Sequence, residues 1–167
     1  MKTKIINFAP KNKFYSDILE GRKNQTIRDK PIEVGQKVAL WEKTRGMKKG
    51  FYCNRCFTFC GQLGDTAHKM PCTCMDEYLI FPRKIKDAVI KECVSIWMRY
   101  DYNDDREAIA YGIGNSSTGK VIYNDKPHAS LVKSDTPNWT NQQFIDFFKK
   151  AYPQMKKEPV KMYIWKW

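Results

Sequence analysis

The sequence has no long apolar run and few acidic side chains for its length. No stretch of its 167 residues approaches the roughly 20 apolar residues of a membrane-spanning helix. No apolar leader follows Met1, and no internal repeat or low-complexity tract stands out. We therefore expect a cytoplasmic protein with no membrane partner. A chain of this length predicts one domain over residues 1–167.

The shortage of acidic residues leaves the chain strongly basic. It has 18 Asp and Glu against 30 Lys and Arg, which gives a formal net charge of +12. Such a balance favours a polyanion as partner, namely RNA, DNA or a nucleotide. The alternative is that the excess positive charge serves solubility only.

The six cysteines are unevenly spread along the chain. Five of them lie within 22 residues. Because no export signal is seen, we expect a reducing compartment, where clustered thiols favour metal binding over disulfides. Cys53-x-x-Cys56 and Cys72-x-Cys74 supply four sulfurs, the number that a closed tetrahedral zinc site needs. Such a site is structural, because no coordination position stays open for a substrate.

Two further side chains of the same segment are alternative ligands. On spacing alone, Cys60 can replace Cys74 as a ligand, and His68 is the other candidate. Cys93 is expected to be an ordinary strand thiol. Residues 44–76 are predicted to be a zinc-knuckle-like insertion, because metal can supply the folding energy of a segment without its own hydrophobic core. The alternative is a disordered insertion with free thiols. Basic residues such as Arg55 would let a knuckle touch nucleic acid.

Apolar periodicity predicts several strands and a few helices. Alternation of apolar and polar residues predicts strands, and apolar residues three and four apart predict helices. Strands are expected over residues 4–8, 24–28, 37–42, 78–81, 86–98, 121–123 and 160–167. Helices are expected over residues 14–20, from Asn103 to near Gly112, and from Thr140 to Pro153. The mixture predicts an α+β fold.

Two of these helices have a predicted buried face. In the first helix, Phe14, Ile18 and Leu19 are expected to face inward. In the last helix, Thr140 and Gln143 form a capping box. Its buried stripe is predicted to be Phe144, Phe147, Phe148 and Ala151.

The stretch over residues 18–28 has an unusual concentration of charge. Gly21 is expected to end the preceding helix, since it can adopt the left-handed backbone conformation without steric cost. Like charges this close repel each other unless an anion sits among them, and Gln25 or Asn24 could read a base edge. The alternative is a solvated basic rim. The cations of this stretch are Arg22, Lys23 and Arg28.

Two motifs here resemble a known family. Gly21-x-Lys23-x-x-x-x-Arg28 follows Ile18-Leu19 and precedes a segment over residues 34–40 of the form V-G-x-x-V-x-L. This arrangement resembles the signature of the ASCH domain family, small PUA-like β-barrels. The resemblance implies an α+β PUA-like barrel with two to three helices, carrying the Cys-rich insertion. A last strand at the C-terminus fits the closure of such a barrel.

The resemblance also implies a nucleic-acid-related function. We expect RNA or modified-nucleotide binding. Together with the charge of this stretch, the resemblance leads us to expect a binding site made by Arg22, Lys23, Gln25, Thr26 and Arg28.

The alternative function is an amidohydrolase that acts on N4-acylated cytidine-type nucleosides, as some ASCH members resemble. In those members a lysine, a threonine and an acidic side chain form the site, and the first two match Lys23 and Thr26. The two are an odd number of residues apart, so they converge only if the chain turns between them. Ile113 stands where the family pattern has its carboxylate. The sequence does not choose among the substitutes, which are Asp101, Asp104, Asp105, Glu107 and Asp135.

Overall fold

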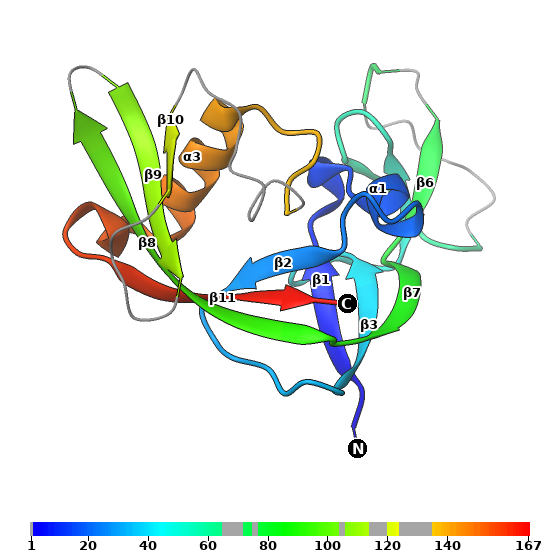
Figure 1. Cartoon of the computed structure of the whole chain (residues 1–167). Coiled ribbons are helices and arrows are strands. Elements are labelled where there is room, and N and C mark those ends of the chain that lie inside the picture. Colours follow the sequence, from blue (N-terminus) through cyan, green and yellow to red (C-terminus); the bar gives the residue numbers. More distant parts are fainter. Residues whose placement is uncertain (1, 65–71, 75–76, 104–105, 114–119, 124–134) are drawn as a thin grey trace. The chain divides into compact units, whose positions relative to one another are not determined.

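The computed structural model describes residues 2–64, 72–74, 77–103, 106–113, 120–123 and 135–167. The chain divides into a first unit (residues 1–20 and 37–88) and a second unit (residues 21–36 and 89–167). Strands dominate both units, and the described residues contain two α-helices (Figure 1). The α+β prediction is confirmed; the PUA-like barrel and the single domain with an insertion over 44–76 stay predictions. No helix in the described parts of the chain is long and apolar enough to cross a membrane.

The first unit contains a sheet with strand order β1-β3-β7. It consists of β1 (Lys4–Phe8), β3 (Lys37–Glu42) and β7 (Arg83–Val89). β1 and β3 run parallel, with Ile6 opposite Leu40. Both side chains are buried, as the alternation along these two strands requires. The strands predicted over 4–8 and 37–42 are confirmed.

Two short helical elements follow β1, namely a 3-10 helix η1 (Pro10–Asn12) and α1 (Tyr15–Leu19). Phe14 and Ile18 are buried, as predicted, but Leu19 is 48% exposed. The prediction for Leu19 is wrong because residues four apart share a helix face, whereas the residue after Ile18 points about 100° away from it.

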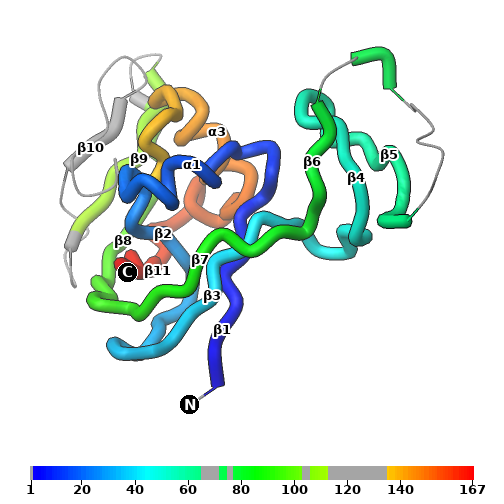
Figure 2. The backbone as a smooth tube through the Cα atoms, turned by 90° about the vertical axis from the view of Figure 1, so that its right-hand side faces the viewer, coloured from blue at the N-terminus to red at the C-terminus, as the bar shows by residue number. Residues whose placement is uncertain are grey.

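A second sheet of the first unit lies within and just after the segment predicted as an insertion. Its strands β4 (Gly50–Cys53), β5 (Phe59–Gly61) and β6 (Tyr78–Phe81) have the order β5-β4-β6, and Figure 2 shows them side by side. The sequence predicted β6 but not β4 and β5, because these two strands contain glycine and cysteine and show no alternation of apolar and polar residues. Gly50 is required here: a Cβ at this position would lie 2.3 Å from the Gly61 carbonyl oxygen.

The second unit is built on one antiparallel sheet with strand order β10-β9-β8-β11-β2. The strands are β2 (Gln25–Arg28), β8 (Glu92–Asn103), β9 (Arg106–Ile113), β10 (Lys120–Tyr123) and β11 (Val160–Lys166). The core side chains Ile27, Ile96 and Ile164 lie on one face. The strands predicted over 24–28, 121–123 and 160–167 are confirmed within a residue or two.

Two predictions in this unit are wrong. The helix predicted from Asn103 is the strand β9, which pairs with β8 so that Arg106 lies opposite Asn103. Pairing with β8 from Ile96 to Asn103 outweighs the helical propensity of the alanines in this segment. The single strand predicted over 86–98 is two strands, β7 and β8, in different sheets. Between them, Ile90 pairs its backbone with Gly35 and Gln36.

The main helix of the second unit is α3 (Asn141–Ala151), which is followed by the 3-10 helix η2 (Pro153–Lys156). Its capping box is confirmed: the Gln143 N–H donates to Thr140 Oγ1 at 3.2 Å, and the Thr140 N–H donates to Gln143 Oε1 at 2.9 Å. The predicted stripe is partly wrong, since Phe147 is 43% exposed and Ala151 is exposed. The core face is made instead by Phe144, Ile145 and Phe148.

Candidate metal centre and the Lys23 site

Four cysteines gather in the first unit. The sulfurs of Cys53, Cys56, Cys72 and Cys74 all lie within 4.8 Å of one another. A tight turn places the first pair: the Phe57 N–H donates to the Cys53 carbonyl at 2.9 Å, and the Cys53 N–H donates to the Thr58 carbonyl at 3.0 Å. The structure therefore brings together the four sulfurs that the spacing predicts.

The four sulfurs fit a tetrahedral ion. With metal–sulfur bonds of about 2.3 Å, tetrahedral geometry separates the sulfurs by about 3.8 Å, which the observed spread allows. Four thiolates leave no open coordination position, so the site suits a structural ion. The cluster could therefore bind a metal ion.

Among the described residues, Cys60 is not part of this cluster. Cys60 lies in β5, where its thiol donates to the Thr58 carbonyl at 3.1 Å. Cys93 lies in β8 of the second unit, consistent with its prediction as a strand thiol. His68 lies outside the described residues.

The protonation of the cluster shows why a cation suits it. Hydrogen bonds with the Thr58 side chain and backbone lower the pKa of Cys56 to about 6. The backbone N–H of Cys74 favours the Cys72 thiolate, but burial and the sulfurs of Cys53 and Cys56 together raise the pKa of Cys72 to about 12. The pKa of Cys74 is also raised, mainly by Cys56. Neighbouring thiolates oppose one another's ionisation, and a bound cation would remove that opposition.

The segment that carries the first two cysteines of the cluster is basic. Residues 43–64 contain five basic and no acidic side chains. Four of the cations are exposed and have no ion-pair partner within the described part of the chain. They are Arg45, Lys48, Lys49 and Arg55. A polyanion can therefore approach this segment without displacing an internal carboxylate.

In the second unit, Lys23 is buried in an ion pair with Asp135. Lys23 is 1% exposed and Asp135 is 6% exposed. The ammonium donates to Asp135 Oδ1 at 2.8 Å, to the Asp135 carbonyl, and to the Gln25 carbonyl at 3.0 Å. These three acceptors match the three N–H groups of an ammonium. The solvated-rim alternative is therefore wrong for Lys23.

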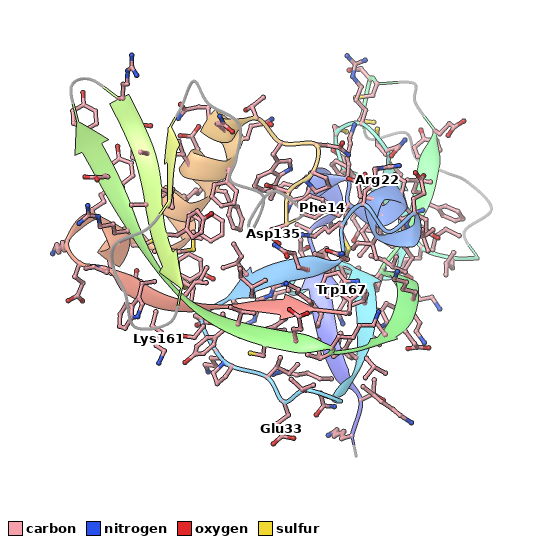
Figure 3. All side chains as sticks on the ribbon, in the orientation of Figure 1. Phe14, Arg22, Glu33, Asp135, Lys161 and Trp167 are labelled. Atoms are coloured by element: carbon pink, nitrogen blue, oxygen red, sulfur yellow. The ribbon has the colours of Figure 1, made fainter. Side chains whose placement is uncertain are left out.

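Asp135 is the acidic partner that sequence reasoning could not choose. It lies 112 residues from Lys23, on the segment that leads to α3, and Figure 3 shows it beside β2. Two other candidates have different partners, because Asp101 pairs with Arg99 and Glu107 with Lys149. Asp104 and Asp105 lie outside the described residues. No sequence signal links positions this far apart.

The remaining predicted site residues do not share one face of β2. Gln25 and Thr26 are buried, Arg28 is half-buried and Arg22 is exposed. Thr26 lies opposite Trp165 in β11, and neighbouring strand residues point to opposite faces. Gln25 and Thr26 therefore face opposite ways, while Lys23 precedes the strand. Ile113 lies in β9, where its backbone is opposite Ile96.

The pKa of Tyr152, in the second unit, is shifted by burial and by the charges near the Lys23–Asp135 pair. Burial raises the pKa of Tyr152, and the charges of Asp29 and Asp135 raise it further, while Arg28 opposes them. The Thr136 hydroxyl, next to Asp135, is buried without a hydrogen-bond partner among the described residues. Tyr152 and Thr136 thus add two further polar groups to the region of the Lys23–Asp135 pair.

Comparisons with known proteins do not assign the chain to a family. A scan against protein-family models, a search of curated proteins and a search of solved structures each find no significant match. The ASCH resemblance accordingly rests on the two motifs around Lys23.

Proposed function

We propose that this chain is an ASCH-type domain that binds RNA or a modified nucleotide, with a structural zinc ion held by Cys53, Cys56, Cys72 and Cys74. One observation carries the proposal: an acid-free segment with five cations (residues 43–64) folds around the cysteine site. In such a segment, the strands and the metal site would hold the positively charged side chains in fixed positions. Phosphates are the anions that such an arrangement suits best.

Zinc is the ion that this donor set favours. Four thiolates in tetrahedral arrangement are typical of structural zinc sites. When bound, zinc would supply the charge that keeps the four sulfurs deprotonated. The residues that would hold it belong to β4, to the turn after β4 and to the segment of Cys72 and Cys74.

The basic corner of the second unit would add a second contact. Arg22 is exposed and Arg28 half-buried, so these arginines would reach phosphate oxygens. Lys23 has a different role in this proposal, because its ammonium is already matched by acceptors from Gln25 and Asp135. It would position the corner rather than contact the phosphate.

A binding titration tests the proposal. The zinc-loaded protein is titrated with single-stranded RNA, duplex RNA and free cytidine nucleosides at two salt concentrations. Preference for a strand, with affinity that falls as salt rises, is expected because each phosphate contact releases counterions. Absence of binding to all three probes at low salt would refute the proposal. Binding of a modified nucleoside alone, insensitive to salt, would restrict the function to a small pocket.

A second candidate function is amide hydrolysis of an N4-acylated cytidine. The specific observation that favours it is the Lys23 ammonium 2.8 Å from the Asp135 carboxylate, a proton donor beside a proton acceptor. Hydrolysis adds water across the C–N bond: hydroxide goes to the acyl carbon, and a proton goes to the leaving amine. Asp135 could take the proton that water loses, while Lys23 could give a proton to the leaving amine and regain one from Asp135. Burial of both groups ranks this candidate second.

Release of acetate from N4-acetylcytidine tests this candidate. Turnover by the wild type that is lost in Asp135→Asn but kept in Asp101→Asn would support it. Asp101 is a suitable control because it is a half-exposed carboxylate paired with Arg99. No acetate release by the wild type would remove the candidate, and the binding proposal would be unaffected.

A further inference from the structure

A pocket of about 270 Å³ lies in the first unit, and its lining includes Tyr52 and Phe57, the residues that adjoin Cys53 and Cys56 in the chain. Its lining combines aromatic and cationic side chains, with a turn of backbone between them. The lining residues that matter here are Lys11, Arg45, Met47, Tyr52 and Phe57. This volume is slightly below the ~300–1,000 Å³ of pockets for drug-sized ligands, so it admits one flat ring rather than a larger molecule.

Tyr52 forms a rigid wall of the pocket. It is 7% exposed, and its hydroxyl donates to the Lys48 carbonyl at 2.8 Å. Its ring meets Phe59 and Phe81 edge-on, with centroids 5.2 and 5.8 Å away. Contacts on several sides hold the ring in place, so this wall is present before any ligand arrives.

Phe57 occupies a backbone conformation that bulky residues rarely adopt. Its φ is +58°, in the left-handed region, and it immediately follows Cys56. The turn between Cys53 and Thr58 imposes this conformation through its two backbone hydrogen bonds. Such outliers persist where the surrounding structure enforces them, often at ligand sites. The turn that holds Cys53 and Cys56 therefore places the Phe57 ring in the pocket lining, although the positive φ of Phe57 is sterically unfavourable.

The cations of the pocket are available to an anion. Lys11 and Arg45 are exposed, and neither has an ion-pair partner among the described residues. Arg45 lies in a turn that also lines the pocket, in which the Met47 N–H donates to the Thr44 carbonyl at 3.3 Å. The pocket thus offers aromatic surface inside and positive charge at its edge.

We propose that this pocket binds one unpaired nucleobase of an RNA strand, stacked on Phe57, with Arg45 and Lys11 contacting the flanking phosphates. The inference rests on the proposed function and deepens it by naming where a base is held. An aromatic face stacks on any base, and a basic edge follows the backbone, which is how single strands are bound without sequence readout. A base-paired strand cannot enter, because its bases are stacked on one another.

The test compares two probes with the same phosphates. The zinc-loaded full chain is titrated with an oligouridylate and with an abasic ribose-phosphate strand of equal length. The wild type is expected to bind the oligouridylate more tightly. Phe57→Leu and Phe57→Gly should weaken that binding by about 5- to 100-fold, the usual value of one stacked base. Binding of the abasic strand should be unchanged.

The variants are chosen so that folding does not obscure the result. Glycine favours a positive φ, so Phe57→Gly keeps the turn while removing the ring, and retained zinc stoichiometry verifies this. Phe147→Leu is the control, because Phe147 is an exposed aromatic of the second unit. Arg45→Gln should weaken both strands and reduce the salt slope by about 0.7. Lys157→Gln, an equal change of charge at another exposed position, should weaken both strands less.

The outcomes separate this inference from the proposed function. Equal binding of the two strands, unaffected by Phe57→Gly, would overturn the base pocket and leave RNA binding intact. Failure of the wild type to bind either strand would overturn both. Competition by an acidic peptide as effective as by the oligouridylate would also overturn the base pocket, because a peptide offers charge without a nucleobase.

Discussion

The cysteine cluster and the Lys23–Asp135 pair differ in the kind of groups that they bring together. The cluster brings four thiols together. The backbone of Cys74 lowers the pKa of Cys72, but burial and the sulfurs of Cys53 and Cys56 outweigh it and raise that pKa to about 12. The pair brings opposite charges to 2.8 Å and matches every N–H of the ammonium. The cluster therefore offers a site that a cation could fill, whereas the chain itself supplies the acceptors for the Lys23 ammonium. Only the first unit should depend on an external ligand for its fold.

The energies involved set the order of the expected effects. Structural zinc contributes about 10–16 kcal/mol of binding free energy in small domains at neutral pH. Removal of one partner from a buried ion pair costs about 3–5 kcal/mol, because the other charge stays buried. A surface ion pair contributes about 0–1 kcal/mol. Four experiments compare the two regions, from the largest expected effect to the smallest.

Removal of the metal should have the largest effect. Chelation, or Cys72→Ser, is expected to unfold the sheet of β4, β5 and β6 and to leave the sheet of the second unit folded. Amide hydrogen exchange checks this: protection should vanish at Tyr52 and persist at Ile96. Cys93→Ser is the control, since Cys93 lies outside the cluster. Unfolding of both units together would contradict the comparison.

Loss of the buried pair should come next. Lys23→Met is expected to lower the free energy of unfolding of the second unit by about 3–5 kcal/mol, measured in urea. Lys23→Met with Asp135→Asn should cost less than the sum of the two single changes, because no buried charge then remains alone. The exposed pair of Lys84 and Asp87 serves as control. Additive costs would show that the two groups do not stabilise each other.

A packing defect beside the cluster should have an intermediate effect that metal offsets. In Gly50→Ala the new Cβ would lie 2.3 Å from the Gly61 carbonyl oxygen, so β4 and β5 must separate. A loss of about 1–3 kcal/mol in stability is expected, seen as a lower zinc affinity. Excess zinc should restore the thermal midpoint of the variant. A variant with unchanged zinc affinity would show that β4 and β5 tolerate the separation.

The smallest effect should be a pH dependence in the second unit. Hydrogen bonds from Lys149, Gln142 and Tyr100 lower the pKa of Glu107 to about 2 from 4.5. A lowered pKa gives stability that is present above the unfolded value near 4.5 and is lost as the pH falls towards 2. Glu107→Gln should therefore cost on the order of 1 kcal/mol at pH 7 and show a flatter acid unfolding curve. Equal acid sensitivity of variant and wild type would contradict this.

The features that sequence reasoning found are those encoded locally. Cys53-x-x-Cys56 and Cys72-x-Cys74 lie within one short segment, and the capping box of Thr140 and Gln143 spans four residues. The predictions that failed depend on distant pairing. β9 was predicted as a helix, because its alanines suit either state until β8 pairs with it. The partner of Lys23 lies 112 residues away, and nothing in the intervening sequence marks Asp135.

The measurement that tests the central claim most directly is the affinity of single-stranded RNA before and after removal of zinc. The account predicts tight, salt-sensitive binding by the zinc-loaded protein and a large loss after chelation, because the basic segment and Phe57 lose their frame. Readdition of zinc should restore it. RNA affinity unchanged by zinc removal, with the second unit still folded, would contradict the claim that the cysteine cluster organises the binding surface.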